Sequence, residues 1–456
     1  MEATALFDSL TSLGKRLLIL VATALGLSTI TGCSLRQEQV LVPSLVELQS
    51  LEYRGTIRFM PTDGALEADL QIAIPDPSQR QFSFILAASL GNAQVTGPEV
   101  RDISISPQQT FGRTVNAYTI TLAPSRNGSE RVVAFKYGGE LVPDDAPLAI
   151  NAISERRIEL TADSFWFPLE TSFGRSIDAS LTVEIDGNWN GVAPGSFEQT
   201  STGFSLEQDV GGSDISLALL SHPVVYRVGD YAVYDNRSEL GENIEGVVAA
   251  LSACSGFLND LAGPADLLPK AQIMVFGRRS SGYSRRTVIA LTDPSGSDEV
   301  PLTQFICHEL AHNWSRANSS TPEQWHNEGL ADAIANLALR DIFGSQAYED
   351  RLASYRERLL SAEGSLGPIW TPDLNDRTSF LVAYVAAPLA LAQLEERLGK
   401  ALFRSFLRRL MNEKVARTPR MLAVLEEVAG SDQSKWFEDM LAREANALAK
   451  SKHDAG

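Results

Sequence analysis

The stretch that decides the fold is His308-Glu309-Leu310-Ala311-His312, which is followed after fifteen residues by Glu328. On a helix, residues four positions apart lie on one face, so His308 and His312 can direct two imidazole nitrogens at one metal ion. Glu309, one position after the first histidine, lies beside that ion. The spacing therefore predicts a zinc helix that carries two ligands and a general base.

A catalytic zinc ion needs three protein ligands and one position open to water. Glu328, on a second helix, is predicted to be the third ligand. The bound water then ionises near neutral pH, and Glu309 can take its proton as the water attacks a carbonyl carbon. His326 is a rival third ligand, at or before the start of the second helix. The pattern predicts metal-assisted amide hydrolysis with one zinc ion per chain.

Both motifs resemble those of the gluzincin aminopeptidases, the membrane alanyl aminopeptidase family. The zinc helix of that family reads like His-Glu-Leu-Ala-His-Gln-Trp, and its second helix opens Trp-Leu-Asn-Glu-Gly-Phe-Ala. Residues 308–314 and 325–331 of this chain match these stretches, although the interval between them is shorter than the family usually has. The resemblance implies that His308, His312 and Glu328 bind zinc. It also implies that Glu309 is the general base.

Asp332 is predicted to support the metal site. It lies four positions after Glu328 on the same helical face, where its carboxylate can accept the second N–H of His308 and fix the tautomer of that ring. The plainer alternative is an acidic residue in the first helical turn, which the helix dipole favours.

A donor for the negatively charged tetrahedral intermediate is also expected, and it is worth roughly 3 kcal/mol of barrier. In the aminopeptidase family a tyrosine fills this role, in a segment like Tyr-x-Lys-Gly followed later by Leu-Glu-x-x-x-Gly. Residues 380–403 contain Tyr384 and then the Leu-Glu pair at 394–395, with two alanines in place of Lys-Gly. The resemblance implies that Tyr384 is the oxyanion donor. A core tyrosine with a satisfied hydroxyl is the alternative.

Substrate specificity is expected to depart from the family. Its exopeptidases carry a Gly-x-Met-Glu-Asn run whose glutamate binds the free amine of the substrate, whereas residues 282–286 read Gly-Tyr-Ser-Arg-Arg. Arginines beside a cleft repel an ammonium group and favour an acidic one. We therefore expect Arg285 or Arg286 to bind a negatively charged substrate group, and we do not expect strict aminopeptidase activity. Two solvated surface arginines are the alternative.

The N-terminal segment predicts export. Lys15 and Arg16 precede an apolar run at residues 17–27, as in a secretory signal, and this run is shorter than the about 20 apolar residues of a spanning helix. Residues 30–33 read Ile-Thr-Gly-Cys and resemble the bacterial lipoprotein signal. We therefore expect a signal peptide at residues 1–32, lipidation of Cys33 and a tether at residues 33–48. An uncleaved membrane anchor is the alternative.

The predicted location is outside the cytoplasmic membrane, held by the lipid anchor. In a cell with two membranes this means the periplasmic side or the outer membrane, and otherwise the cell surface. No later segment is expected to be apolar enough to span a membrane.

Residues 49–236 show the pattern of strands. In residues 66–74 apolar residues alternate with polar ones, and residues 177–185 repeat this pattern, with turn residues bounding each run. Many short strands separated by turns indicate an antiparallel β domain, as the aminopeptidase family has before its catalytic domain. From 237 to 456 the pattern is mostly helical, with strands expected at 271–276 and 287–291 before the zinc helix. The predicted fold class is α+β, with an N-terminal β domain and a thermolysin-like peptidase domain.

Charge and cysteine content limit the partners. The formal net charge is −18, which makes a nucleic-acid partner improbable and leaves a peptide or protein substrate and the membrane. Cys254 and Cys307 can pair in an exported protein only if their Cα atoms lie within about 7 Å, which the sequence does not show. Cys307 is expected to be a small buried residue. Glu395, Glu396 and Arg397 are expected to form a solvated face.

A catalytically silent lipoprotein is the alternative function. Such a protein would bind partners through its β domain and keep zinc for structure. Glu309 argues against this interpretation, because a structural zinc site has no need of a base. A zinc endopeptidase, or a peptidase of acidic substrates, is the alternative within the enzymes.

Overall fold

The computed structural model describes residues 50–75, 78–124, 131–141, 150–171, 175–209, 212, 214–229, 231–237, 243–278, 282–315, 322–375 and 378–449. The predicted signal peptide, the lipidation site Cys33 and the tether all lie outside the described residues.

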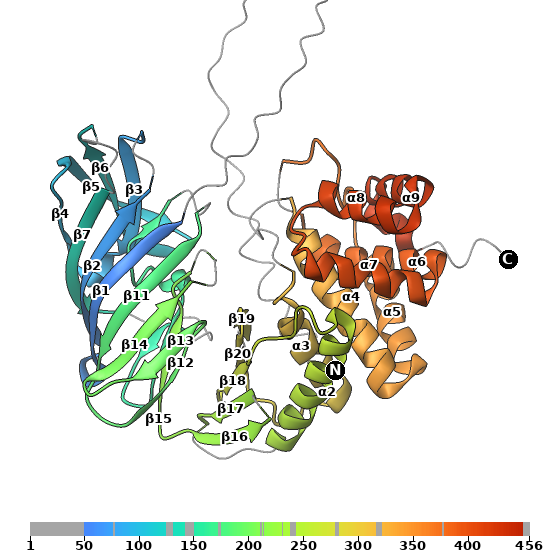
Figure 1. Cartoon of the computed structure of the whole chain (residues 1–456), viewed down its shortest axis with the longest axis horizontal. Helices are drawn as coiled ribbons and strands as arrows, with labels where there is room; N and C mark the ends of the chain where they lie inside the picture. Colours follow the sequence, from blue (N-terminus) through green and yellow to red (C-terminus); the bar gives the residue numbers. More distant parts are fainter. Residues whose placement is uncertain are drawn as a thin grey trace, which may run out of the picture. The chain divides into compact units, whose positions relative to one another are not determined.

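The first half of the described chain consists of strands, drawn in blue to green in Figure 1. A seven-stranded sheet has the order β13-β14-β11-β1-β2-β7-β4, and its neighbours are antiparallel except for the parallel pair β1 and β11. Its strands are β1 (Leu51–Met60), β2 (Ala65–Ile74), β4 (Gln94–Thr96), β7 (Arg131–Glu140), β11 (Ile177–Glu184), β13 (Ser196–Gln199) and β14 (Gly203–Gln208).

Two four-stranded antiparallel sheets accompany it, in the orders β10-β3-β6-β5 and β12-β15-β9-β8. The strands are β3 (Gln81–Ala87), β5 (Val100–Thr110), β6 (Arg113–Leu122), β8 (Ala152–Ile153), β9 (Arg157–Leu160), β10 (Leu169–Glu170), β12 (Trp189–Val192) and β15 (Leu217–Ser221). Short 3-10 turns lie at η2 (Pro61–Asp63), η3 (Ala88–Leu90) and η4 (Ala162–Ser164).

The alternation seen in the sequence explains these sheets. In β2, Leu66, Leu70 and Ile72 are buried while Glu67 and Asp69 between them are exposed. Successive side chains of a strand point to opposite faces, so this pattern places one face of the sheet on a hydrophobic core. The predicted antiparallel-rich β domain is confirmed.

The second half of the chain begins with a mixed sheet in the order β16-β17-β18-β20-β19. Its strands are β16 (Val224–Val228), β17 (Tyr231–Asp235), β18 (Gln272–Val275), β19 (Tyr283–Arg285) and β20 (Val288–Leu291). The three central strands are parallel, and both edge strands are antiparallel to their neighbours. β16 and β17 precede residue 237, where the sequence places the domain boundary, and yet they pair with this sheet.

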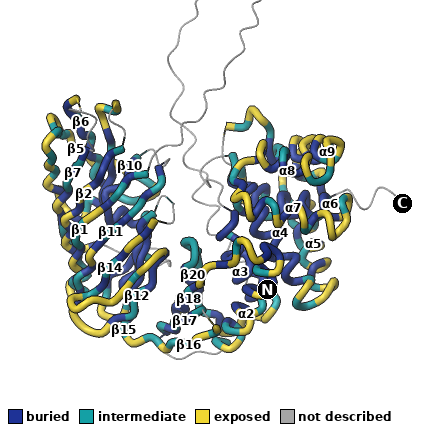
Figure 2. Tube along the Cα trace, viewed as in Figure 1, coloured by how far each residue is buried: buried dark blue, intermediate teal, exposed yellow. Residues whose placement is uncertain are grey.

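Helices make up the rest, drawn in yellow to red in Figure 1. They are α2 (Ile244–Ala262), α3 (Glu299–Ala311), α4 (Gln324–Phe343), α5 (Ser345–Leu360), the π-helical turn η5 (Val382–Ala386), α6 (Ala387–Leu398), α7 (Lys400–Asn412), α8 (Thr418–Ala429), α9 (Ser431–Leu441) and the 3-10 turn η6 (Ala445–Ala449). α4 is buried along most of its length (Figure 2) and packs against α3, α5 and α6. The predicted order of a β domain followed by a mostly helical domain is confirmed.

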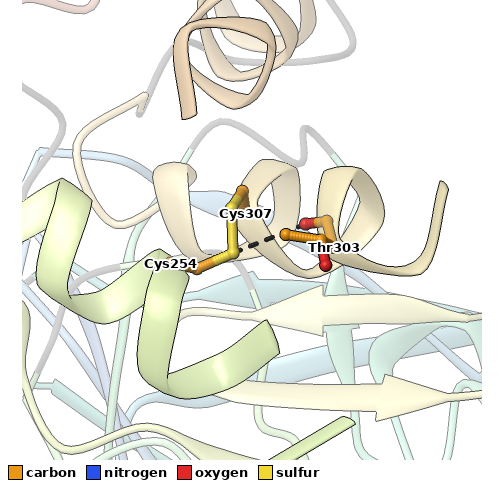
Figure 3. The surroundings of a disulfide bond; sticks show 3 residues. All are labelled: Cys254, Thr303 and Cys307. Carbon is orange, nitrogen blue, oxygen red and sulfur yellow. Dashed lines mark hydrogen bonds between the residues drawn. A yellow bond between two sulfur atoms is a disulfide. The ribbon is translucent and has the colours of Figure 1, made fainter. Parts of the chain in front are cut away.

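Two expectations about single side chains need correction. Cys307 is fully buried, as expected, but it also forms a disulfide with Cys254 of α2, with their Cα atoms 5.1 Å apart (Figure 3). The Sγ atom of Cys254 also lies 3.4 Å from the carbonyl oxygen of Thr303, which is a contact rather than a hydrogen bond because a disulfide sulfur has no hydrogen to donate. The bond ties α2 to the helix that carries the histidine pair.

Glu395 is the second correction, since it is only 5% exposed. Both oxygens of its carboxylate accept hydrogen bonds from Arg340 of α4, at 2.9 and 2.6 Å, and Tyr348 donates a third. The packing of α6 against α4 takes this carboxylate out of solvent, while Glu396 and Arg397 remain exposed.

α2 is long and apolar enough to cross a membrane by length and composition, and no other described helix is. The expectation that no later segment is apolar enough to span a membrane is therefore wrong. Val247, Leu251 and Leu258 of α2 are buried in the core of the helical part, and its Cys254 is bonded to α3. These contacts are those of a core helix.

Candidate active site

Two helices bring three ligand atoms together. The Nε2 atoms of His308 and His312 lie 3.2 Å apart, and Oε2 of Glu328 lies 3.5 and 3.4 Å from them. In a tetrahedral zinc site with bonds of about 2.0–2.1 Å, the ligand atoms lie about 3.3–3.4 Å from one another. The three atoms therefore match one face of a tetrahedron and leave the fourth corner for water or substrate. This donor set fits one zinc ion.

Local helix geometry aims the two rings. His308 lies in the last turn of α3, and His312 is its C-terminal cap with helical φ and ψ of −60° and −13°. The four-residue spacing therefore still places both rings on one face. Their centroids are 4.8 Å apart and their planes are nearly perpendicular, at 89°. Among the described residues, the group that can hold a metal ion consists of these histidines and Glu328.

Asp332 orients His308. Nδ1 of His308 lies 3.2 Å from Oδ1 of Asp332, so a proton on Nδ1 leaves Nε2 as the metal-binding atom. Gln304 donates to the same oxygen at 2.5 Å, and the hydroxyl of Tyr355 donates to Oδ2. Arg351 of α5 lies 3.9 Å from Oδ1. The carboxylate is 3% exposed, and these contacts hold it in one orientation.

The pKa values of His308 and Glu328 depart from their ordinary ranges because of burial and of their neighbours. Burial lowers the pKa of His308, but hydrogen bonds with Asp332 and Glu328 raise it to about 10. Burial raises the pKa of Glu328, but the charge of His312 and hydrogen bonds with both histidines bring it well below its usual range. Without a metal ion, His308 is therefore protonated on both ring nitrogens at neutral pH, and a metal ion that binds there has to displace one of these protons.

Glu309 follows His308 on α3 and is 8% exposed. His326, the rival ligand, is fully buried at the start of α4 and is not part of the metal-ligand group. Neither of its ring nitrogens has a hydrogen-bond partner among the described residues, and burial lowers its pKa to about 4. The structure thus includes His308 and His312, but not His326, in the group that can hold a metal ion.

Tyr384 stacks on a metal ligand. Its ring centroid lies 6.1 Å from that of His308, with the planes 24° apart, and it is half-buried in the π-helical turn η5. Pro388 explains the wide turn, because it has no N–H to bond to the carbonyl of Tyr384 four residues earlier. Gly329 of α4 permits close packing of this helix against α6, since a Cβ atom at Gly329 would lie 2.5 Å from Cβ of Ala387.

Arg285 lies on the edge strand β19 and is held by two carboxylates. Its Nε donates to Asp214 at 2.6 Å, and another nitrogen donates to Asp163 at 3.1 Å. Burial lowers the pKa of Arg285, but Asp214 and Asp163 raise it above its usual range. Arg286 is half-buried, with a φ of 59° and its guanidinium beside Gly212. Recognition of an acidic substrate by these two arginines stays a prediction.

Comparison with known proteins bears on the fold. No family model and no curated protein matches this sequence. The structure of an M1 zinc metallopeptidase from Deinococcus radiodurans matches with a TM-score of 0.61 and 16% identity, over 87% of this chain and 94% of that chain. The fold is that of the M1 zinc metallopeptidases. Native leukotriene A4 hydrolase from Saccharomyces cerevisiae matches with a TM-score of 0.62 and 15% identity, over 86% of this chain and 66% of that one.

A further match is a mutant of the Deinococcus peptidase bound to a Tyr-Ser-Ala substrate, with a TM-score of 0.58 and 14% identity. The fold of this chain thus agrees with the motif resemblance noted in the sequence. The part of that prediction that concerns a lipoprotein rests on residues outside the described ranges.

Proposed function

We propose that this protein is a zinc-dependent metallopeptidase. The observation that carries the proposal is the separation of 3.2 to 3.5 Å among the ligand atoms of His308, His312 and Glu328, with Glu309 next to the first of them. The M1 zinc metallopeptidase fold, and the tripeptide substrate bound to one protein of that fold, support a peptide substrate.

A zinc ion bound here would act as a Lewis acid toward a water molecule and the substrate carbonyl. Glu309 takes the proton of the attacking water and returns it to the leaving amine. The hydroxyl of Tyr384 donates a hydrogen bond to the carbonyl oxygen as that atom becomes negative. Asp332 keeps His308 in the tautomer whose Nε2 faces the metal.

Metal removal tests the cofactor. We expect about one zinc ion per chain in the purified protein, and hydrolysis of a mixed peptide library that stops when a chelator removes the metal. Adding zinc back should restore the activity. Hydrolysis that continues at the same rate in the metal-free protein would overturn the proposal.

The proposed specificity is not that of a strict aminopeptidase. Arg285, the last residue of β19, and Arg286, which follows it, stand where the exopeptidases of the resembling family carry an amine-binding glutamate. Without that carboxylate, a free substrate amine gains little from the site. Peptides with free and acetylated amino termini should be cleaved at similar rates. A requirement for the free amine would restore the aminopeptidase interpretation.

We also propose that the enzyme is exported and held at the membrane by a lipid on Cys33. The motif that ends at Cys33 supports this location. Radiolabelled palmitate should label the wild type and not a Cys33→Ala variant, and the variant should leave the membrane fraction. Equal labelling of both proteins would contradict the anchor.

A further inference from the structure

A column of stacked groups leads from a metal ligand to the protein surface. Tyr384 stacks on His308, and Phe380 stacks on Tyr384 with ring centroids 4.6 Å apart and planes 18° apart. The guanidinium of Arg358, from α5, lies 5.7 Å from the ring centroid of Phe380. Phe380 is 37% exposed, so the outer end of this column meets solvent. It places a cation one aromatic ring beyond the proposed oxyanion donor.

Arg358 forms no ion pair with a carboxylate in the part of the chain that the structure describes, whereas other arginines of the chain do. Arg340 forms a bidentate pair with Glu395, and Arg285 pairs with Asp214 and Asp163. The charge of Arg358 thus lies near the candidate active site, in a chain with a net charge of −18, without a carboxylate of the described residues in ion-pair contact.

The surroundings of Arg358 make its charge costly. Burial lowers the pKa of Arg358, and the neighbouring cation Arg351 lowers it further, while Tyr355 and Asp332 act in the opposite direction. Asp332 is already engaged by His308, Gln304 and Tyr355. A half-buried guanidinium that stacks on an aromatic ring is held in one plane, and its fork of N–H groups matches a carboxylate. An incoming anion would supply the ion-pair partner that the described residues do not.

We propose that Arg358 is a specificity residue that binds a carboxylate of the peptide substrate, with Phe380 holding the guanidinium plane. The carboxylate belongs to an acidic side chain or to the C-terminus of a short peptide. This inference rests on the proposed peptidase function and names the substrate class of that site. It transfers the recognition of acidic groups, which the sequence suggested for Arg285 and Arg286, to a different element.

Paired peptides test this assignment. One pair differs only by Glu or Gln beside the cleaved bond, and a second pair differs only by a free or an amidated C-terminus. A charged hydrogen bond is worth about a tenfold to hundredfold preference. We expect kcat/KM to favour the acidic member of one pair by about tenfold. The pair that responds identifies the source of the carboxylate.

Substitutions on α5 test whether Arg358 causes the preference for acidic peptides. Arg358→Gln should raise KM for the acidic member to that of its neutral partner and leave kcat for neutral peptides unchanged. Arg358→Glu should reverse the preference toward a lysine-containing peptide. Arg356→Gln is the matched control, because it removes the same charge from the same helix at a residue that is also half-buried. It should leave the preference intact, and thermal melts check that each variant is folded.

Measurements of peptide binding test the role of Arg358 independently of catalytic turnover. Calorimetry with zinc-loaded Glu309→Gln protein should give a Kd about tenfold lower for the acidic peptide than for its neutral partner. The difference should disappear when Arg358→Gln is added. Equal Kd values for both members of both pairs, or a preference that survives Arg358→Gln, would overturn the inference. An absence of zinc-dependent hydrolysis in wild type, with the binding preference present, would overturn only the proposed peptidase function.

Discussion

The charged residues of the metal-ligand group and those of the edge strand β19 differ in how far along the sequence their partners lie. His308 and Asp332 meet because two helices each place residues at four-position spacing, and the described hydrogen-bond and ion-pair partners of Asp332 come from α3 and α5. Arg285 finds Asp214 across 71 residues of sequence and Asp163 across 122. Chemistry that depends on helical spacing is therefore visible in the sequence, and chemistry that depends on strands meeting distant loops is not.

A large effect on catalysis at the metal site is expected from Tyr384→Phe. Removing the hydroxyl removes one donor to the developing oxyanion, so kcat should fall about 100-fold with zinc content unchanged. Zinc analysis and steady-state kinetics measure both quantities. Tyr348→Phe, on α5, is the control that removes a hydroxyl bonded to Glu395 instead, and it should keep kcat. Unchanged kcat in Tyr384→Phe would make Tyr384 a packing residue.

A smaller effect is expected from Asp332→Asn. The amide accepts a weaker hydrogen bond from His308 and can favour the wrong tautomer, so zinc affinity should fall about 10- to 100-fold. Competition with a fluorescent chelator measures this affinity. The control is Asp341→Asn, which removes a carboxylate from an exposed position of the same helix. If both variants bind zinc as wild type does, Asp332 does not support the ligand.

The smallest effect is expected from Arg285→Gln on the edge strand. It leaves the carboxylate of Asp214 without its cation, so the free energy of unfolding should fall by about 1–3 kcal/mol. The KM for acidic peptides should stay the same, because this guanidinium is occupied by two carboxylates. Denaturant unfolding and kinetics give the two values. A rise of KM for acidic peptides with stability unchanged would instead support substrate recognition by Arg285.

The sequence allowed much of the metal site to be predicted, because its information is local. His308 and His312 follow from helical spacing, Glu328 from the need for a third ligand and the resemblance of the second motif, and Asp332 from one further turn of α4. The resemblance pointed to Tyr384, and the structure adds the π-helical turn that presents it. That turn has a signal in the sequence, since Pro388 removes the hydrogen bond that would close a regular turn there.

Other features depend on tertiary packing, and no pattern in the sequence predicts them. Cys254 and Cys307 are 53 residues apart and meet only because α2 packs against α3. Tyr355 reaches Asp332 from α5, where no motif marks it. Glu395 looked solvated because it lies beside two other charged residues, but the contact between α6 and α4 buries it against Arg340.

The central claim is that Glu309 performs catalysis at a zinc ion held by its neighbours. The most direct test compares wild type with Glu309→Gln for zinc content and for peptide hydrolysis. We predict equal zinc in both proteins and a fall in kcat of about 1,000-fold in the variant, because the amide cannot take the proton of the attacking water. Equal zinc with equal turnover would contradict this account.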